Sequence, residues 1–277
     1  MTKIVRISVL GPTGRLGGAI CREIIDSEGV ELAGALVRAS SDAVGKDIGI
    51  LAGRDPVGVT SVSSLSEAVE SADIVIDASL PDATVEAAEY LAGKGGPPLV
   101  TGVTGFSEAQ DERLNAAAQR LPLLWAGNFS LGVAMAETLV RQAAALPADV
   151  WDIEIEEAHH RMKADAPSGT ALMLARAAAE KRGQSLGDVA VWAREGHTGP
   201  REGGSIGFAV TRGGSIIGDH SVRFISEMEE ITISHRAFDR AVFARGALAA
   251  AIWMHNNGQG RPAGMHSMHD VVGATSS

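Results

Sequence analysis

The segment EEAHHRMKADAPSGTA, residues 156–171, gathers several proton-transferring side chains just before a turn that can start a helix. His159 and His160 are adjacent, and Lys163 follows His159 by four residues. A histidine and a lysine at this spacing can serve in one pocket as a proton donor and a cationic anchor. The pattern favours acid–base chemistry on an anionic substrate.

The same segment continues into a predicted helix start that can bind a carboxylate. Pro167 fits the first turn of a helix, and Ser168 is a suitable N-cap residue. We expect exposed amides at Gly169 and Thr170, where the helix dipole also attracts an anion. One segment thus offers an anion-binding cradle together with a cation and two imidazoles.

Purely structural explanations of this segment remain open. Paired histidines are often surface residues or hydrogen-bonded core residues, and a capped helix start needs no ligand. Metal binding by His159 and His160 is disfavoured because adjacent side chains seldom converge on one ion, and no HExxH spacing occurs nearby. We therefore expect no metal site.

A second constellation, ISVLGPTGRLGGAI, places Gly11, Gly14 and Gly17 between the first predicted strand and the first predicted helix. Small residues there let the backbone approach a pyrophosphate, which the amides at the helix N-terminus can bind. Thr13 stands where the commonest fingerprint has its second glycine. The turn predicts a dinucleotide site, although a tight strand-to-helix connection would use similar residues.

The end of the second predicted strand indicates which dinucleotide binds. A carboxylate there bonds the ribose hydroxyls, whereas an arginine attracts a 2′-phosphate. In ALVRASSD, Val37 occupies the position of the acid, and Arg38 follows it. We therefore expect NADPH to be preferred, with NADH still possible; the alternative is that Arg38 is simply a solvated loop residue.

These constellations need elements to position them, and the first half of the chain has an α/β pattern. Apolar runs rich in Val, Ile and Leu alternate with helical stretches, which predicts a doubly wound, Rossmann-type parallel sheet. The predicted strands are residues 4–10, 30–37, 73–79, 98–102 and 121–127. The predicted helices are residues 17–27, 64–71, 81–92 and 107–120.

The second half changes to a different pattern, which predicts a second α+β domain on a largely antiparallel sheet. A helix over 131–146, a strand over 150–158 and a helix over 168–181 precede period-two segments divided by Gly-Gly and Gly-Asp turns. The last strong element, 238–256, is a helix apolar nearly all round. We expect a dinucleotide-binding domain of residues 1–129 joined by 240–277, and a substrate-binding and oligomerisation domain of residues 130–239.

Composition excludes several classes of partner. The 277 residues carry a formal charge of −10, which disfavours nucleic acid and anionic membranes as partners. The single cysteine, Cys21, excludes an intrachain disulfide, and the start of the chain lacks the apolar core of a signal peptide. Because no apolar run approaches the ~20 residues of a membrane span, we expect a cytoplasmic protein.

Taken together, these residues make the chain similar to the dihydrodipicolinate reductase family, also named 4-hydroxy-tetrahydrodipicolinate reductase, of diaminopimelate and lysine biosynthesis. The run EAHHRMKADAPSGTA matches the family motif E-x-H-H-x-x-K-x-D-x-P-S-G-T-A at every specified position. The resemblance extends to TGVTGFSE (101–108), AGNFSLG (126–132) and REGHTGPREGGSIGFA (194–209), and so covers nearly the whole chain.

The resemblance implies roles for the matching residues, and a homotetramer. His159 would be the general acid/base and Lys163 a second proton donor, while His160, Gly169 and Thr170 would contact a carboxylate of a dicarboxylate substrate. The implied cofactor contacts lie in four stretches: Gly11, Pro12, Thr13, Gly14, Arg15 and Leu16; Arg38; Gly102, Val103 and Thr104; and Ala126, Gly127, Asn128 and Phe129.

The implied reaction adds a hydride to C4 of a cyclic, unsaturated imine dicarboxylate and then protonates the resulting enamine. A Rossmann-type dehydrogenase of another small amino or carboxylic acid would explain the glycine turn but not the His-Lys segment. A non-catalytic nucleotide sensor would bind NADPH without consuming it.

The chain departs from the family pattern at three positions. Thr13 replaces a common glycine, and Leu16 replaces a common methionine; both changes concern packing. Val37 replaces an acidic residue frequently seen after the second strand, which puts NADH use in doubt and leaves the reductase assignment unchanged. Asp165 is specified by the motif but has no predicted chemical role.

Overall fold

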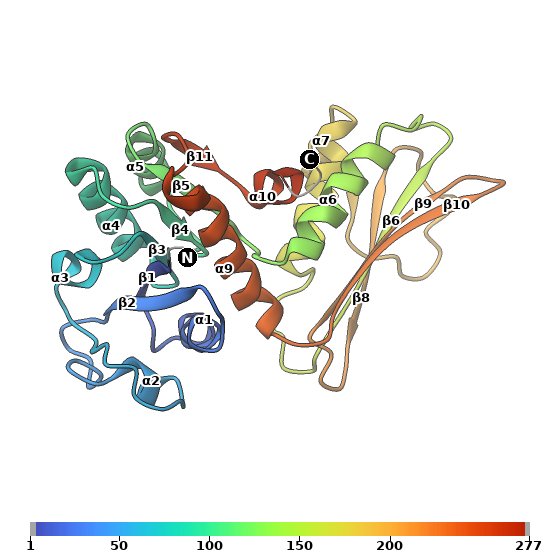
Figure 1. Ribbon diagram of the computed structural model, residues 1–277. Helices are drawn as coiled ribbons and strands as arrows, with labels where there is room; N and C mark the ends of the chain where they lie inside the picture. The colour runs from blue at the N-terminus through green and yellow to red at the C-terminus, as the bar shows by residue number, and fades with distance from the viewer. Residues whose placement is uncertain (1–3, 275–277) are drawn as a thin grey trace. The chain divides into compact units, whose positions relative to one another are not determined.

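The apolar runs of the first half form a six-stranded parallel sheet, in the strand order β11-β5-β4-β3-β1-β2 (Figure 1). The computed structural model describes residues 4–274, so the first three and last three residues of the predicted domain ranges lie outside the described residues. Every pair of neighbouring strands in this sheet is parallel, which confirms the predicted Rossmann-type sheet. The strands are β1 (Val5–Leu10), β2 (Val30–Leu36), β3 (Ile74–Asp77), β4 (Leu99–Thr101), β5 (Pro122–Trp125) and β11 (Gly264–His266).

Helices pack on this sheet through alanine-rich and leucine-rich faces. Three of them supply one apolar core: α3 (Leu65–Val69), α4 (Pro81–Lys94) and α5 (Glu108–Ala118). The two helices α1 (Arg15–Ile25) and α9 (Ala241–His255) pack against each other, and α9 also contacts β3, β4 and β5. The predicted all-round apolar helix is thus α9, with eight buried residues.

Three short elements of this first unit were not predicted from the sequence: α2 (Ile48–Leu51), β11 and α10 (Met268–Ala274). The strand β11 has only three residues, without a run of apolar side chains, and it forms because its backbone pairs with β5. A short 3₁₀ turn, η1 (Asn256–Gly258), follows α9. Tertiary pairing rather than a local pattern therefore determines β11.

The second unit is built on a five-stranded sheet in the order β10-β9-β6-β8-β7. Its strands are β6 (Asp152–His159), β7 (Ala190–Val191), β8 (Ile206–Arg212), β9 (Gly218–Ile225) and β10 (Glu230–Ala237). Its helices are α6 (Leu131–Ala143), α7 (Gly169–Lys181) and α8 (Leu186–Val189). Side chains of α6 and α7 join those of β6, β8 and β9 in one buried core.

This second sheet is mixed, which refines the predicted antiparallel arrangement. The strand β6 lies between β8 and β9, parallel to the first and antiparallel to the second, so the Gly-Gly turn at 213–214 does not close a hairpin. The predicted Gly-Asp turn lies inside β9, where Gly218 and Asp219 pair with β10. Period-two alternation indicates a strand with one buried face but does not identify its neighbours, which explains the difference.

The chain divides into two units by its contacts: one holds the chain up to Leu131 and from Ala241 onward, and the other holds Gly132–Arg240. Within residues 4–274, we find no helix that is both long enough and apolar enough to cross a membrane.

Candidate active site

The loop between β1 and α1 has a backbone that requires glycine at two positions. Gly11 has a φ of +77°, and a Cβ there would lie 2.8 Å from the carbonyl oxygen of Ala78. A Cβ on Gly17 would lie 2.1 Å from the carbonyl oxygen of Gly11. Gly14 is the N-cap residue of α1 and has no side chain that could occupy the first helical amides. The turn therefore fits the pyrophosphate of a dinucleotide.

The two residues of this loop that depart from the family pattern, Thr13 and Leu16, fit the structure. Thr13 is exposed, so the chain accommodates a side chain where a glycine is common. Leu16 is half-buried, Pro12 is buried, and Arg15 is exposed at the first position of α1. All six residues from Gly11 to Leu16 follow the carboxyl end of β1, the edge at which open parallel sheets bind ligands.

At the end of β2, the side chain that would read the ribose is apolar. Val37 is buried, with an exposed fraction of 5%, and its amide donates to the carbonyl oxygen of Val62 at 2.9 Å. Arg38 is exposed immediately after it. This edge of the sheet thus has an apolar side chain where many NAD enzymes have a carboxylate, and a guanidinium follows it in the chain.

The ends of β4 and β5 are packed closely against each other. A Cβ on Gly102 would lie 2.4 Å from the ring of Phe129, so this glycine allows the close approach of the ring. The indole Nε1 of Trp125 donates to the carbonyl oxygen of Val103 at 2.8 Å. Because Val103, Ala126 and Phe129 have buried side chains, only their backbone groups could contact a ligand.

Three predicted cofactor residues in these two loops are more accessible. Thr104 and Gly127 are exposed, and Asn128 is half-buried. The side-chain Oδ1 of Asn128 accepts a hydrogen bond from the Ser130 amide at 2.8 Å, which fixes the side chain within this loop.

A buried carboxylate, that of Asp77, ties the ends of β3 and β4 together. Its Oδ2 accepts hydrogen bonds from the hydroxyls of Thr84 at 2.6 Å and Thr101 at 2.9 Å. Its Oδ1 accepts from the amide and the hydroxyl of Ser79. Burial raises the pKa of the Asp77 carboxyl, although the hydrogen bonds from Ser79, Thr84 and Thr101 oppose this increase. The carbonyl of Asp77 also accepts from the Gly102 amide at 3.1 Å.

In the second unit, His159 is the last residue of β6 and its ring meets a second buried carboxylate. The Nδ1 of His159 lies 2.6 Å from Oε2 of Glu157, whose side chain is fully buried. A carboxylate can only accept, so Nδ1 carries a proton and Nε2 is the ring nitrogen that can act on a ligand.

Glu157 is held by donors from two further elements. Arg212, the parallel partner of His159 at the end of β8, forms a bidentate ion pair with Glu157 at 2.7 and 2.8 Å. The amide of Ser168, the N-cap residue of α7, donates to Oε1 at 3.0 Å. Burial alone would raise the pKa of the Glu157 carboxyl, but hydrogen bonds from Arg212, His159 and Ser168 lower it below its ordinary value.

A third histidine, His220 on β9, lies beside His159. The two ring centroids are 5.0 Å apart in an edge-to-face arrangement, and Nε2 of His220 lies 2.9 Å from the Ser168 hydroxyl. Burial, with the nearby His159 as a second cause, lowers the pKa of His220 to about 4. His220 is therefore neutral at physiological pH.

His160 and Lys163 have polar partners of their own. The Nε2 of His160 lies 3.1 Å from a guanidinium nitrogen of Arg240. The ammonium of Lys163 forms two hydrogen bonds to Asp165, at 2.9 and 2.8 Å, which gives Asp165 a role that was not predicted. The Lys163 ammonium lowers the pKa of the Asp165 carboxyl. The two adjacent histidines thus contact different groups, Glu157 and Arg240.

The start of α7 has the predicted capping pattern. The hydroxyl of Ser168 accepts from the Ala171 amide at 3.2 Å, one turn into the helix. Gly169 is exposed, and a Cβ there would meet no described atom within 4 Å. Thr170 follows in the first turn of the helix. This open helix end, with His160 and Lys163 in the preceding loop of the same unit, can bind a carboxylate.

Sequence reasoning missed four polar residues that the fold brings to these groups: Asp77, Arg212, His220 and Arg240. Glu157 was visible in the motif, but its contact with His159 was not predicted. Arg212 and His220 come from strands far along the chain, and only the strand order places them beside His159. No local signal could have identified them.

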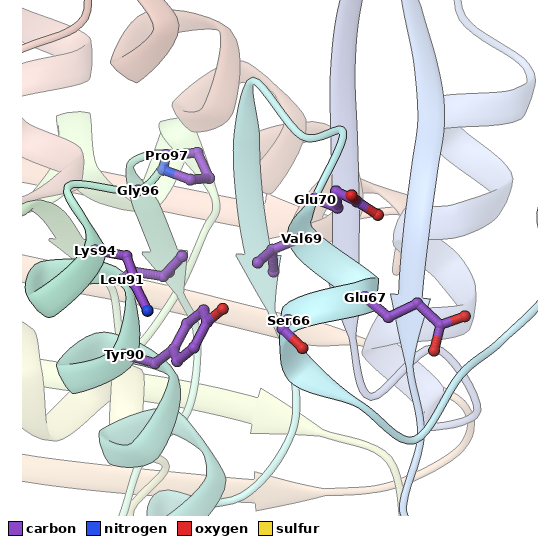
Figure 2. A pocket seen from close by; sticks show the side chains of 9 residues that line it. All are labelled: Ser66, Glu67, Val69, Glu70, Tyr90, Leu91, Lys94, Gly96 and Pro97. Atoms are coloured by element: carbon purple, nitrogen blue, oxygen red, sulfur yellow. The ribbon is translucent and has the colours of Figure 1, made fainter.

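A surface hollow of about 510 Å³ lies between α3 and α4 of the first unit (Figure 2). Ser66 and Glu67 of α3 and Tyr90 and Lys94 of α4 line it, together with residues that precede β4. It contains none of the predicted site residues, and it lies at the amino ends of β3 and β4. Ligands of open parallel sheets bind at the opposite edge, so we do not assign it to the active site.

Comparison with known proteins gives a consistent family. A family model described as "Dihydrodipicolinate reductase, N-terminus" matches residues 5–129, and one described as "Dihydrodipicolinate reductase, C-terminus" matches residues 132–272. The 4-hydroxy-tetrahydrodipicolinate reductase of Parvibaculum lavamentivorans is 48% identical over 274 residues, and that of Caulobacter vibrioides 47% identical over 274 residues. Each alignment covers 99% of both chains.

A solved structure has the same fold. The dipicolinate-bound dihydrodipicolinate reductase from Paenisporosarcina sp. TG-14 matches with a TM-score of 0.74 and 22% sequence identity. The match covers 95% of this chain and 97% of that chain.

Proposed function

Because this chain belongs to the dihydrodipicolinate reductase family, we infer that it reduces 4-hydroxy-tetrahydrodipicolinate to tetrahydrodipicolinate in lysine and diaminopimelate biosynthesis. It is a pyridine-nucleotide-dependent oxidoreductase. The observation that carries this assignment is the sequence identity of 47–48% to two reductases over nearly the full length of the chain.

The proton chemistry is assigned to the second unit. The 4-hydroxyl group leaves as water, which gives the unsaturated ring, and the reduced nicotinamide, when bound, would supply a hydride to its C4. His159 then supplies the proton that the resulting enamine needs, from Nε2, because Glu157 occupies Nδ1 at 2.6 Å. Lys163 is the second proton donor, and substrate binding draws its ammonium from Asp165 toward the ligand.

The substrate carboxylate is assigned to the start of α7. The amides of Gly169 and Thr170 face the anion at the positive end of the helix, and His160 adds a hydrogen-bond donor. Arg240, which lies 3.1 Å from His160, adds a positive charge to the residues that would bind the carboxylate. A dicarboxylate with one carboxylate held in this way would present its ring to His159.

NADPH is the proposed preferred cofactor. The pyrophosphate is assigned to the turn from Gly11 to Leu16, and the nicotinamide end to Gly102–Thr104 and Ala126–Phe129. Buried Val37 cannot repel a 2′-phosphate, and exposed Arg38 can pair with one. NADH remains a usable alternative because the remaining contacts do not involve that phosphate.

The broader organisation follows the same proposal. Residues 1–129 joined by 240–277 form the nucleotide domain, and residues 130–239 form the substrate-binding and oligomerisation domain. The enzyme acts as a cytoplasmic homotetramer. Sedimentation of the purified chain checks the oligomeric state.

The experiment that tests the proposed function measures oxidation of NADPH and of NADH with freshly generated heterocyclic substrate. We expect rapid, substrate-dependent oxidation, with a higher kcat/KM for NADPH. A preference for NADH would contradict the cofactor assignment. Binding of NADPH without consumption would identify a sensor, and faster turnover of another small acid would identify a different dehydrogenase.

A further inference from the structure

One carboxylate, that of Glu157, joins three elements of the second unit. It meets His159 on its own strand, β6; it is paired with Arg212 at the end of β8; and it accepts the amide of Ser168 at the start of α7. Two of these contacts use Oε1 and two use Oε2, so the four acceptor positions of a carboxylate are all occupied. A carboxylate bound in this way has no freedom to rotate.

We propose that Glu157 is a positioning residue of the reaction, which fixes the tautomer and direction of the His159 ring and links it to the substrate-binding helix start. This inference rests on the proposed role of His159 as proton donor. Glu157 is buried two residues before His159 and acts through the imidazole rather than on the substrate.

Arg212 makes this arrangement possible by keeping the carboxylate ionised. A buried glutamate without a cation would take up a proton, and a protonated carboxyl would donate to Nδ1 instead of accepting from it. The bidentate pair of Arg212 with Glu157 prevents this, at 2.7 and 2.8 Å. The proton on Nδ1 is then fixed, and proton exchange with the ligand is restricted to Nε2.

The surroundings confine the ring on its other sides. The ring of His220 lies at an interplanar angle of 71° to that of His159, and it is held in turn by the Ser168 hydroxyl. A Cβ on Gly218 would lie 3.1 Å from Nε2 of His159, so glycine at this position keeps the reactive nitrogen free of close contact. The contacts with Glu157, His220 and Gly218 together hold the His159 imidazole in a single orientation.

The test is a double-mutant cycle of Glu157→Gln and His159→Gln in the full-length enzyme, with kcat and NADPH affinity measured for each variant. The glutamine variant keeps the volume of Glu157 but removes its charge. We expect kcat to fall about 10²-fold in Glu157→Gln, less than the ~10⁴-fold found when a serine protease loses the charge of the carboxylate behind its histidine. In the His159→Gln background, the same change should lower kcat by less than about threefold, because the residue through which it acts is gone.

A pH profile separates positioning from general stabilisation. The substitution removes a negative charge that lies 2.6 Å from the ring, so the decline of kcat at alkaline pH should begin at lower pH in Glu157→Gln. His220, which faces the ring, and Arg212, which pairs with residue 157, are unchanged in this variant. A merely structural ion pair would lower the melting temperature and leave the profile in place.

The matched control is Glu156→Gln. Glu156 is the preceding residue of β6, is exposed, and pairs with Arg223 at 3.1 Å. We expect its kcat to stay within about twofold of the wild type, because the effects of surface substitutions are small.

Three outcomes overturn the proposal: a kcat within about threefold of wild type in Glu157→Gln, an unchanged pH profile in that variant, or a double variant whose loss of kcat is the product of the two single losses. If Glu157→Gln does not fold, Arg212→Lys keeps the charge but loses the bidentate geometry, and an unaltered kcat and pH profile in that variant would equally refute it. The function itself is tested separately, since wild-type turnover and the His159→Gln single variant report on it without reference to Glu157.

Discussion

Each of the two candidate sites contains a buried carboxylate, and the two are held in opposite ways. Asp77 in the first unit accepts from three hydroxyls and one amide, all of neutral residues, and burial raises the pKa of its carboxyl. Glu157 in the second unit is paired with Arg212 and His159, and these hydrogen bonds lower its pKa despite burial. The cation decides the direction, because burial penalises the charged form in both cases.

The difference matches the role that we propose for each unit. Around the glycine turn, neutral donors hold Asp77 and fix the ends of β3 and β4 as a rigid edge for a dinucleotide. Around His159, an ionised acceptor is needed so that the imidazole keeps a defined proton. Changes in the first unit should therefore alter cofactor binding, and changes in the second should alter turnover.

The largest expected effect among the next four tests belongs to Lys163. Lys163→Gln removes a proposed proton donor, so kcat should fall by about 10²-fold while NADPH affinity stays unchanged. Steady-state kinetics and a fluorescence titration with NADPH measure the two quantities. Lys181→Gln, at the exposed end of α7, is the control. Retention of kcat within about threefold would remove Lys163 from the mechanism.

The second test concerns Arg38 in the first unit. Arg38→Ala should weaken NADPH binding by about 10- to 100-fold, because a hydrogen bond to a charged group contributes roughly 1.5–3 kcal/mol. NADH has no 2′-phosphate, so its dissociation constant should change by less than about twofold. Arg120→Ala, another exposed arginine of this unit, should change neither constant. Equal losses for the two cofactors would show that Arg38 does not read the phosphate.

The third test uses the pH dependence of stability. The pKa of His220 lies at about 4 instead of 6.5. Between pH 4 and pH 6.5, His220 is therefore protonated in the unfolded chain but neutral in the folded chain. The contribution of His220 to stability is complete above pH 6.5 and is lost as pH falls toward 4. His159, Glu157, His235 and Lys163 are the titratable groups that influence it.

The variant His220→Gln can still bond the Ser168 hydroxyl but cannot take up a proton. Between about pH 7.5 and about pH 5, the free energy of unfolding of the wild type should fall by about 2 kcal/mol more than that of the variant. Urea unfolding at several pH values and one protein concentration measures this difference. Parallel curves for the two proteins would mean that His220 is not buried as a neutral ring.

The fourth and smallest effect is expected from Asp77→Asn. The asparagine NH₂ group would be a donor that faces the donor hydroxyls of Thr84 and Thr101. The ends of β3 and β4 would therefore lose the stabilisation of about one net hydrogen bond. NADPH affinity should fall about fivefold, with kcat at saturating NADPH unchanged. Asp82→Asn, an exposed residue of α4, is the control. A fall in kcat without a change in affinity would reverse the proposed division between the units.

Prediction from the sequence succeeded where one local pattern determines the structure. The apolar runs became the parallel strands β1 to β5, and Ser168 became the N-cap residue of α7. Gly11 and Gly17 were recognised as a turn, and their close contacts show why glycine is required there.

The sequence could not reveal features that depend on strand order. The insertion of β6 between β8 and β9 brings Arg212 and His220 to His159, although both lie more than fifty residues along the chain. The role of Asp165 required the loop geometry that brings its carboxylate to Lys163. The domain boundaries, the cofactor preference and the roles of the site residues stay predictions.

The most direct test of this division is the variant His159→Gln, in which kcat at saturating NADPH is measured together with the dissociation constant of NADPH. Positioned acid catalysis typically contributes 10²–10⁴-fold, so we expect kcat to fall by about that factor. The dissociation constant should stay within about twofold of the wild type, because the glycine turn and Arg38 are intact. A kcat within about threefold of the wild type would contradict the assignment of His159 as the proton donor.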